Sequence, residues 1–285
     1  GSKEGIMHIS MAFLNKGDKV LVPNPGYPTY SSVSNLVEAE IENYDLSEEN
    51  NWSIDLDKLK EKDLSKVKLM WINYPNMPTG APANIEDITA LISLAQQHEF
   101  LIINDNPYSQ ILNNNPFSIF QIEGAKDVCL ELNSLSKSHN MAGWRVGWLA
   151  GAKEYISTVL KVKSNMDSGM FLGLQYASIK ALSNSSQWHD NQNSIYIKRK
   201  ELIVSIYDHL GVKYDSNATG MFVWGKVNND TSNVEDFVND ILYKANVFIT
   251  PGFIVGSNGD RFIRASLCAN ENLIKEALQR IKDNI

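Results

Sequence analysis

The feature that most constrains this chain is the alternation, in its first half, of short apolar segments with longer amphipathic ones. The apolar segments have the length of strands and cover 19–23, 40–46, 67–73, 100–104, 127–133 and 145–150. The segments before and between them read as helices, over 3–15, 28–38, 55–62 and 84–98. Apolar residues recur at helical spacing in 3–15, the segment 84–98 is amphipathic, and 55–62 is polar. Short strands separated by helices are typical of βαβ units. We therefore predict an α/β fold with a mainly parallel sheet flanked by helices.

The second half has a different character. It predicts helices over 152–183, 186–210, 233–244 and 271–283, and strands over 219–227, 247–250 and 260–266. This pattern indicates a smaller C-terminal α+β domain. We predict a large domain over 1–185 and a small domain over 186–285.

Charge and composition exclude several classes of protein. The formal net charge is -7 and the basic residues form no block, which argues against a nucleic-acid partner. No apolar run approaches the roughly 20 residues of a membrane span, and the start shows no secretory signal. The two cysteines, Cys129 and Cys268, lie far apart in apolar segments, so we expect buried free thiols and neither a disulfide nor a zinc site. A cytoplasmic enzyme without a metal fits these observations.

Polar residues follow the predicted strands at the points where those strands end. They are Tyr27, the segment 76–80, Asp105 with Tyr108, and the segment 134–137. Ligands of open α/β sheets bind at the carboxyl ends of the strands. The sequence therefore predicts that these residues meet in one site.

Each of these residues also has a simpler interpretation. Asp105 ends an apolar run and is equally typical of a helix cap, while Tyr108 is also typical of a core aromatic. Most lysines lie on the surface, but Lys137 follows a strand between small hydroxyl residues, where an amine can face a cleft. Arg145 is either a charge at the start of a strand or a fork for a phosphate or carboxylate.

The motifs around these positions resemble the class I/II aminotransferases, the fold-type I enzymes that use pyridoxal 5'-phosphate (PLP). The segments that carry the resemblance are Gly-Ser-Lys-Glu-Gly at 1–5, Asn-Pro-Gly-Tyr-Pro-Thr-Tyr at 24–30, Asn-Tyr-Pro-Asn-Met-Pro-Thr-Gly at 73–80, Asn-Asp-Asn-Pro-Tyr at 104–108 and Ser-Leu-Ser-Lys-Ser-His-Asn-Met-Ala-Gly-Trp-Arg-Val-Gly at 134–147. The last segment is the most specific, because its Ser, Lys and Arg match the family's lysine segment position for position. The resemblance spans the whole chain, including Arg264 in Phe-Ile-Arg-Ala-Ser at 262–266.

The resemblance implies a role for each residue at the cofactor ring. Lys137 is expected to form a Schiff base with PLP and then to move the substrate proton. Asp105 is expected to pair with the pyridinium nitrogen, so that the ring can take up electrons. Tyr108 is expected to hydrogen-bond the ring oxygen, and Tyr27 to stack on the ring face.

The resemblance also implies two anion sites. Ser2 and Lys3 open a helix whose backbone N–H groups can bind the cofactor phosphate, and Ser134 and Arg145 are expected to complete that site. Arg264 is expected to bind the substrate α-carboxylate as a bidentate pair, although a surface arginine on a strand is the simpler interpretation.

Two features depart from the family pattern. The family usually has an asparagine directly before Pro-Thr-Gly, where this chain has Met77, which cannot donate a hydrogen bond to the ring oxygen. We therefore include the adjacent Asn76 among the expected cofactor contacts. The family also has a further N-terminal segment ahead of Gly-Ser-Lys, which we expect to be missing from this chain.

The resemblance implies an enzyme that moves an amino group between an L-amino acid and a 2-oxo acid, acting as a homodimer. Two alternatives stay open at this point. A PLP-dependent C–S β-lyase of the same fold would keep Lys137, Asp105 and Arg264. An aminotransferase-like effector domain of a transcriptional regulator would keep the fold without the reaction. The sequence does not select one amino acid as the substrate.

Overall fold

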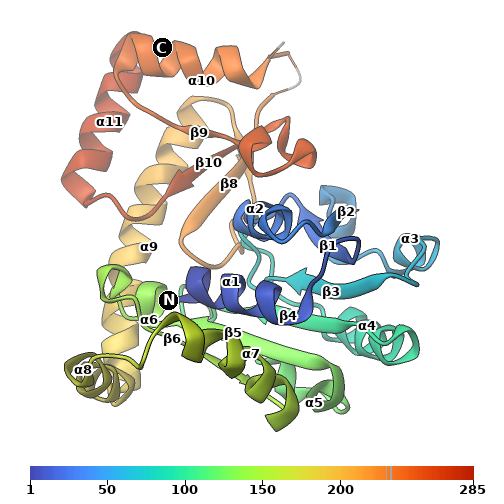
Figure 1. Cartoon of the computed structure of the whole chain (residues 1–285). Helices are drawn as coiled ribbons and strands as arrows, with labels where there is room; N and C mark the ends of the chain where they lie inside the picture. Colours follow the sequence, from blue (N-terminus) through green and yellow to red (C-terminus); the bar gives the residue numbers. More distant parts are fainter. Residues whose placement is uncertain (229, 232) are drawn as a thin grey trace.

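A six-stranded sheet forms the larger part of the protein, which we describe from a computed structural model covering residues 1–228, 230–231 and 233–285 (Figure 1). The strand order is β2-β1-β3-β4-β5-β6. The strands are β1 (Lys19–Asn24), β2 (Glu40–Asp45), β3 (Val67–Ile72), β4 (Leu101–Asp105), β5 (Cys129–Ser134) and β6 (Gly147–Gly151). All neighbouring pairs are parallel except β5 and β6, which run antiparallel. The predicted α/β fold with a mainly parallel sheet is confirmed.

Helices cover both faces of this sheet. One face carries α1 (Ser2–Phe13), α2 (Thr29–Leu36) and α7 (Lys153–Met166), and the other carries α3 (Leu56–Lys60), α4 (Ile85–His98) and α5 (Ala125–Val128). Strand β3 shows why both faces must be covered. Leu69 and Trp71 belong to the core under α1, α2 and α7, whereas Met70 and Ile72 belong to the core under α3, α4 and α5. Successive side chains of a strand point to opposite faces, so a strand that is apolar throughout needs a layer on each side.

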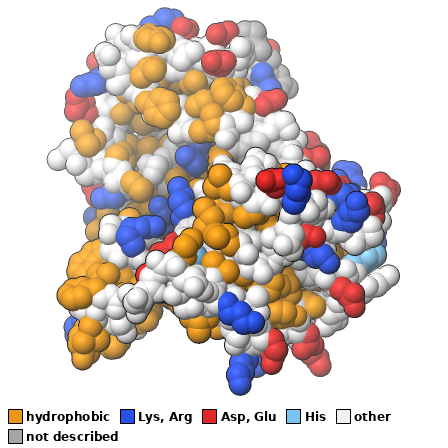
Figure 2. All heavy atoms as spheres, in the orientation of Figure 1, with side chains coloured by type: hydrophobic (Ala, Val, Ile, Leu, Met, Phe, Trp, Pro, Cys, Tyr) orange, Lys and Arg blue, Asp and Glu red, His pale blue; other side chains and the backbone are white. Residues whose placement is uncertain are grey.

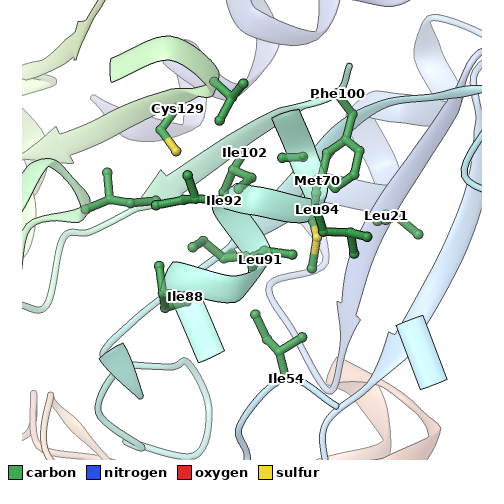
Figure 3. Packing of buried hydrophobic residues seen from close by; sticks show 14 of the residues in the cluster. Leu21, Ile54, Met70, Ile88, Leu91, Ile92, Leu94, Phe100, Ile102 and Cys129 are labelled. Atoms are coloured by element: carbon green, nitrogen blue, oxygen red, sulfur yellow. The ribbon is translucent and has the colours of Figure 1, made fainter. Parts of the chain in front are cut away.

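The core under α4 shows how the helix is held. Ile88, Leu91 and Ile92 recur at helical spacing and pack against the sheet, where Figure 3 shows them facing Met70, Ile102 and Cys129. Asn84 caps the start of α4 by accepting from the backbone N–H groups of Glu86 and Asp87.

A second, antiparallel sheet has the order β7-β8-β10-β9. Its strands are β7 (Lys213–Tyr214), β8 (Phe222–Lys226), β9 (Thr250–Pro251) and β10 (Phe262–Ser266). The helices α9 (Ser186–His209), α10 (Val234–Ala245) and α11 (Glu271–Asn284) share one apolar core with it. All strands of the first sheet precede residue 185 and all strands of the second follow it; the domain boundary itself stays a prediction.

Four expectations from the sequence were wrong in detail. The strand expected over 247–250 begins only at Thr250 and continues to Pro251 as β9. The strand expected from residue 145 begins at Gly147, because Arg145 has a left-handed backbone (φ 57°) that ends a short 3-10 helix. The helical stretch 152–183 is two helices, α7 and α8 (Leu172–Leu182). Cys129 is buried as expected, but Cys268 is exposed, since it lies in the turn after β10 rather than within the sheet.

The second sheet lies beside the carboxyl edge of the first (Figure 1). The segments that follow β1 and β3 hold it there. The Gly26 backbone N–H donates to the Val255 carbonyl at 2.8 Å, and the Asn24 amide donates to Ser257 Oγ at 2.9 Å. The Thr219 backbone N–H donates to the Gly80 carbonyl at 2.9 Å. The edge at which the polar residues were expected to meet is therefore enclosed from two sides.

One helix stands apart from this packing. Helix α8 buries none of its residues, and a group of apolar side chains shows at its position in Figure 2. The exposed apolar residues of α8 and the residue before it are Phe171, Leu172, Tyr176, Ile179 and Leu182. Among the described residues, no helix is long and apolar enough to cross a membrane.

Candidate active site

A cavity of about 360 Å³ opens at the carboxyl ends of the parallel strands. It is lined by Ser2, Lys3, Tyr27, Tyr30, Asn73, Met77, Asp105, Pro107, Tyr108, Ser134, Ser136, Lys137, Ala142 and Arg145. Eight of the ten residues expected at a cofactor or substrate site from the sequence are among them. The predicted convergence of the strand-end residues on one site is therefore what the fold produces.

Lys137 lies on a single helical turn that directly follows β5. The strand ends at Ser134, whose Oγ accepts from the Ser136 backbone N–H at 3.0 Å and so caps the short helix α6 (Leu135–Ser138). The same hydroxyl donates to the Val146 carbonyl, 3.1 Å away, or to Ser136 Oγ, 2.8 Å away. The hydroxyl residues around Lys137 thus fix the turn that carries the amine, which lies part-buried in the cavity wall.

Asp105 ends β4 and is 4% exposed. Its Oδ2 accepts from the Tyr30 hydroxyl at 2.9 Å, while its Oδ1 is buried and has no partner among the described residues. Burial raises the pKa of the Asp105 carboxyl to about 7, and the hydrogen bond from Tyr30 opposes that rise. An unpaired buried carboxylate oxygen is costly, so the cavity favours a ligand that donates a hydrogen bond or carries positive charge at this point.

Asn73 connects Asp105 to the loop that follows β3. Its amide nitrogen donates to the Asp105 carbonyl, and its Oδ1 accepts from the Met77 backbone N–H at 2.7 Å. Asn73 and Met77 are both buried. The end of β4 and the loop that carries Met77 are therefore held in one fixed arrangement.

Aromatic rings form two walls of the cavity. The Tyr27 and Tyr30 rings meet edge to face with their centroids 5.6 Å apart, and Tyr30 stacks on Trp71 at 5.0 Å. Tyr108 packs edge to face on Phe222, 5.8 Å away, and burial raises the pKa of its hydroxyl above the ordinary value. Tyr108 therefore stays a neutral hydrogen-bond donor at physiological pH.

The end of the cavity near α1 suits an anion. Lys3 and Arg145 are exposed cations there, and the Lys3 ammonium lies 5.8 Å from the centroid of the Tyr27 ring. Helix α1 reaches this position because Gly5 lets it lie close to β5: a Cβ at Gly5 would come within 2.5 Å of the Leu132 side chain. A helix N-terminus with unpaired backbone N–H groups attracts negative charge.

Two of the expected residues do not line the cavity. The Asn76 Oδ1 accepts from the hydroxyl (2.8 Å) and the backbone N–H (3.3 Å) of Thr79, while its Nδ2 is buried without a partner among the described residues. Its expected contact with the cofactor ring stays a prediction. Arg264 lies just outside on β10, and its Nη1 is 3.3 Å from the sulfur of Met77, which does line the cavity.

Sequence reasoning missed Tyr30 and Asn73. Tyr30 was quoted in the motif at 24–30 and fell in the helix expected over 28–38, but it was given no role; its contact with Asp105 joins residues 75 positions apart in the chain. The available signal was its place three residues after Tyr27 in a loop already assigned to the site, since i and i+3 lie on one face of a helical turn. Asn73 gave a similar signal as a polar residue at the end of an apolar strand.

The residues present fit the cofactor that the sequence motifs imply. The unpaired Asp105 Oδ1 can accept from a pyridinium N–H, the cations Lys3 and Arg145 line the same cavity, and Lys137 adds a primary amine to its lining. Among the described residues, no group of three or more His, Cys, Asp or Glu side chains could hold a metal ion.

Comparison with known proteins agrees with this geometry. The family model described as "Aminotransferase class I and II" matches residues 1–281. The chain is 41% identical to the LL-diaminopimelate aminotransferase of Halothermothrix orenii, covering 100% of this chain and 73% of that protein. It is 37% identical to the enzyme of the same name from Nitratidesulfovibrio vulgaris, covering 99% of this chain and 73% of that protein.

Solved structures share the fold over the same length. Apo-BacF from Bacillus subtilis superposes with a TM-score of 0.93 at 36% identity, covering 99% of this chain and 76% of that one. A probable N-succinyldiaminopimelate aminotransferase from Thermus thermophilus superposes with a TM-score of 0.91 at 28% identity, covering 100% of this chain and 76% of that one.

Proposed function

The chain belongs to the class I and II aminotransferase family, and from that premise we propose that its amino donor is LL-diaminopimelate and that Lys137, Asp105 and Arg264 carry the reaction. The protein is a PLP-dependent aminotransferase, which moves an amino group between an amino acid and a 2-oxo acid. The observation that carries the assignment of residues is that one cavity is lined by Lys137 and by Asp105, whose Oδ1 is buried without a partner among the described residues. The donor is proposed because relatives 37–41% identical to this chain bear that name.

Four residues would hold the cofactor ring. When bound, PLP supplies an electron sink for the negative charge that develops on the substrate α-carbon. The Lys137 amine would hold the aldehyde carbon covalently, and after release it would carry the α-proton as a general base. Asp105 Oδ1 would accept from the ring N–H and keep the ring cationic. Tyr108 would donate to the ring oxygen, and Tyr27 would cover one face of the ring.

Four others would hold the phosphate. The backbone N–H groups of Ser2 and Lys3 at the start of α1, the Ser134 hydroxyl and the Arg145 guanidinium lie at one end of the cavity. Together they would supply the N–H donors of a helix N-terminus, a hydroxyl and a guanidinium to the phosphate dianion of the cofactor. Arg145 already donates through Nη1 to the Ala142 carbonyl at 2.7 Å, which holds its side chain over this end.

Arg264 would bind the substrate α-carboxylate. It is partly buried, and among the described residues it forms no salt bridge with an aspartate or glutamate. Burial lowers the pKa of its guanidinium from the ordinary value, in the direction expected for a cation without a partner anion. A carboxylate entering from the cavity would supply that anion.

Two measurements test the proposal. Borohydride reduction of the holoenzyme should fix PLP to the peptide that contains Lys137; attachment to any other peptide would show that the site is wrongly assigned. A panel of LL-diaminopimelate, L-lysine, L-aspartate and L-phenylalanine with 2-oxoglutarate should give the highest kcat/KM for LL-diaminopimelate. A clear preference for another member would contradict the donor and leave the site residues standing.

We also propose that the active form is a homodimer. The exposed apolar side chains on and beside α8 support this, because a large apolar surface on a monomer is a sign of an interaction site. Light scattering should give twice the mass of one chain, and Tyr176→Asp with Ile179→Asp should shift the mass toward the monomer. A monomeric mass for the unmodified protein at high concentration would contradict the proposal.

A further inference from the structure

Arg264 is held in place by two neutral groups. Its Nη1 donates to the Met77 sulfur at 3.3 Å, and its guanidinium carbon lies 4.5 Å from the centroid of the Phe222 ring. A thioether is a weak acceptor, and a ring face attracts a cation without carrying a charge. The arginine is therefore oriented while its positive charge stays uncompensated.

The group that orients Arg264 is itself anchored to the cofactor side of the site. Met77 is 3% exposed, and its backbone N–H is held by Asn73, which also binds the Asp105 carbonyl. The other orienting group, Phe222, packs against Tyr108. Arg264 is thus connected through Phe222 to Tyr108, and through Met77 and Asn73 to the backbone of Asp105.

We propose that Met77 is a positioning residue that sets the preference of the enzyme for substrates with an α-carboxylate, by holding Arg264 beside the cavity without neutralising it. This inference rests on the proposed function, in which Arg264 binds that carboxylate. An acidic residue at this position would form an internal ion pair with Arg264 and compete with the substrate. A purely apolar residue would leave the guanidinium without an acceptor and free to adopt other rotamers.

The direct test compares two amino donors in which the same five-carbon chain joins the two amino groups. LL-diaminopimelate and 1,5-diaminopentane differ only in the two carboxylates, and the measured quantity is the ratio of their single-turnover rate constants with the holoenzyme. Met77→Leu keeps nearly the same volume and removes the acceptor. It should reduce the ratio about three- to tenfold, the range expected for one weak hydrogen bond to a charged group. Met77→Gln, which restores a neutral acceptor, should return the ratio to within about twofold of the original value.

A second measurement separates this role from a general loss of structure. The pH titration of the visible absorbance of bound PLP should be the same in Met77→Leu and in the unmodified enzyme, because Arg264 does not bind the ring. Met11→Leu is the matched control, since Met11 is 45% exposed on α1. It should change neither the ratio nor the titration.

Arg264→Leu completes a double-mutant cycle. In that background Met77→Leu should have no further effect on the ratio. Two outcomes would overturn the inference about Met77 alone. In one, Met77→Leu lowers the single-turnover rate constants of the two amino donors by the same factor. In the other, the effects of Met77→Leu and Arg264→Leu on the ratio are fully additive. A normal ratio in Arg264→Leu would overturn the proposed role of Arg264, and this inference with it.

Discussion

The Tyr30 hydroxyl donates to Asp105 Oδ2 at 2.9 Å, and the other oxygen of the same carboxylate is left buried without a partner. One oxygen is thus satisfied from within the fold, and the other has a free acceptor position that suits the ligand proposed above. Tyr30 is in turn stacked on Trp71, with the rings 6° from parallel, so its hydroxyl has little freedom to move away. The orientation of the carboxylate is therefore set before any cofactor enters.

Replacing Tyr30 by phenylalanine should weaken PLP binding. The hydrogen bond from Tyr30 lowers the pKa of Asp105, so its loss should raise that pKa further and leave less carboxylate to pair with the ring. A hydrogen bond to a charged group contributes about 1.5 to 3 kcal/mol, which predicts at least a roughly tenfold increase in the Kd of PLP. Fluorescence titration of the apoenzyme with PLP measures this constant.

Tyr44→Phe is the matched control for that variant. Tyr44 is also buried, and its hydroxyl donates to the Trp71 carbonyl at 2.8 Å without lining the cavity. It should lose about 1 kcal/mol of stability and keep the Kd of PLP. Equal losses of PLP affinity in the two variants would show that Tyr30 acts only through the core.

Asp105 should make the apoenzyme less stable as pH rises. Its pKa is raised by burial from 3.8 to about 7, so the folded state favours the protonated carboxyl. Below about pH 4 both states are protonated and burial has little cost; between pH 4 and 7 the unfolded chain loses the proton first, and stability falls. In Asp105→Asn this loss is absent. The stability of the variant relative to the original apoenzyme should therefore increase by about 2 to 3 kcal/mol between pH 5 and pH 8.

Urea denaturation at the two pH values measures that difference. Other titrating groups are common to both proteins and cancel in it. A difference that is the same at pH 5 and pH 8 would show that the carboxyl titrates normally. The same substitution should also reduce turnover of the holoenzyme severely, because an amide cannot hold the ring cationic.

The sequence was sufficient for the sheet and for most of the site because the signals were local. Each strand ends at a polar residue, and parallel strands place those ends on one edge. Asp105 and Lys137 were predicted from that rule and from their motifs, and the structure brings them to one cavity.

The errors came from contacts that the motifs do not encode. Asn76 was expected to line the site, but it is not among the lining residues, because Thr79, three residues later, offers two donors to its Oδ1. Its contact with the ring stays a prediction. Arg145 was expected to begin a strand, whereas its left-handed backbone turns the chain and allows β6 to return antiparallel to β5. Neither side-chain pairing nor the sign of φ at a non-glycine residue can be inferred from apolar periodicity.

The two cysteines should react at very different rates. Burial raises the pKa of the Cys129 thiol to about 12, whereas Cys268 is exposed. The thiolate is the reactive form, so an aromatic disulfide reagent should titrate one thiol quickly and the second only after denaturation. Cys268→Ser should remove the fast phase. Survival of that phase in the variant would place the reactive thiol at Cys129.

Adding a methyl group at Gly80 should disturb the contact between the loop after β3 and the segment before β8 of the second sheet. Its φ of 76° is unfavourable for other residues, and a Cβ there would lie 2.6 Å from the Thr219 carbonyl oxygen and 2.9 Å from Ala218 Cβ. Gly17→Ala is the matched control, because Gly17 has a φ of 85° but open space around the added atom. The control should lose about 1 kcal/mol, from backbone strain alone. Gly80→Ala should lose about 2 to 4 kcal/mol and should also raise the KM of the amino donor, since the loop that carries Met77 must shift away from the second sheet. Equal losses of stability in the two variants, with an unchanged KM, would show that this contact does not help to position the site.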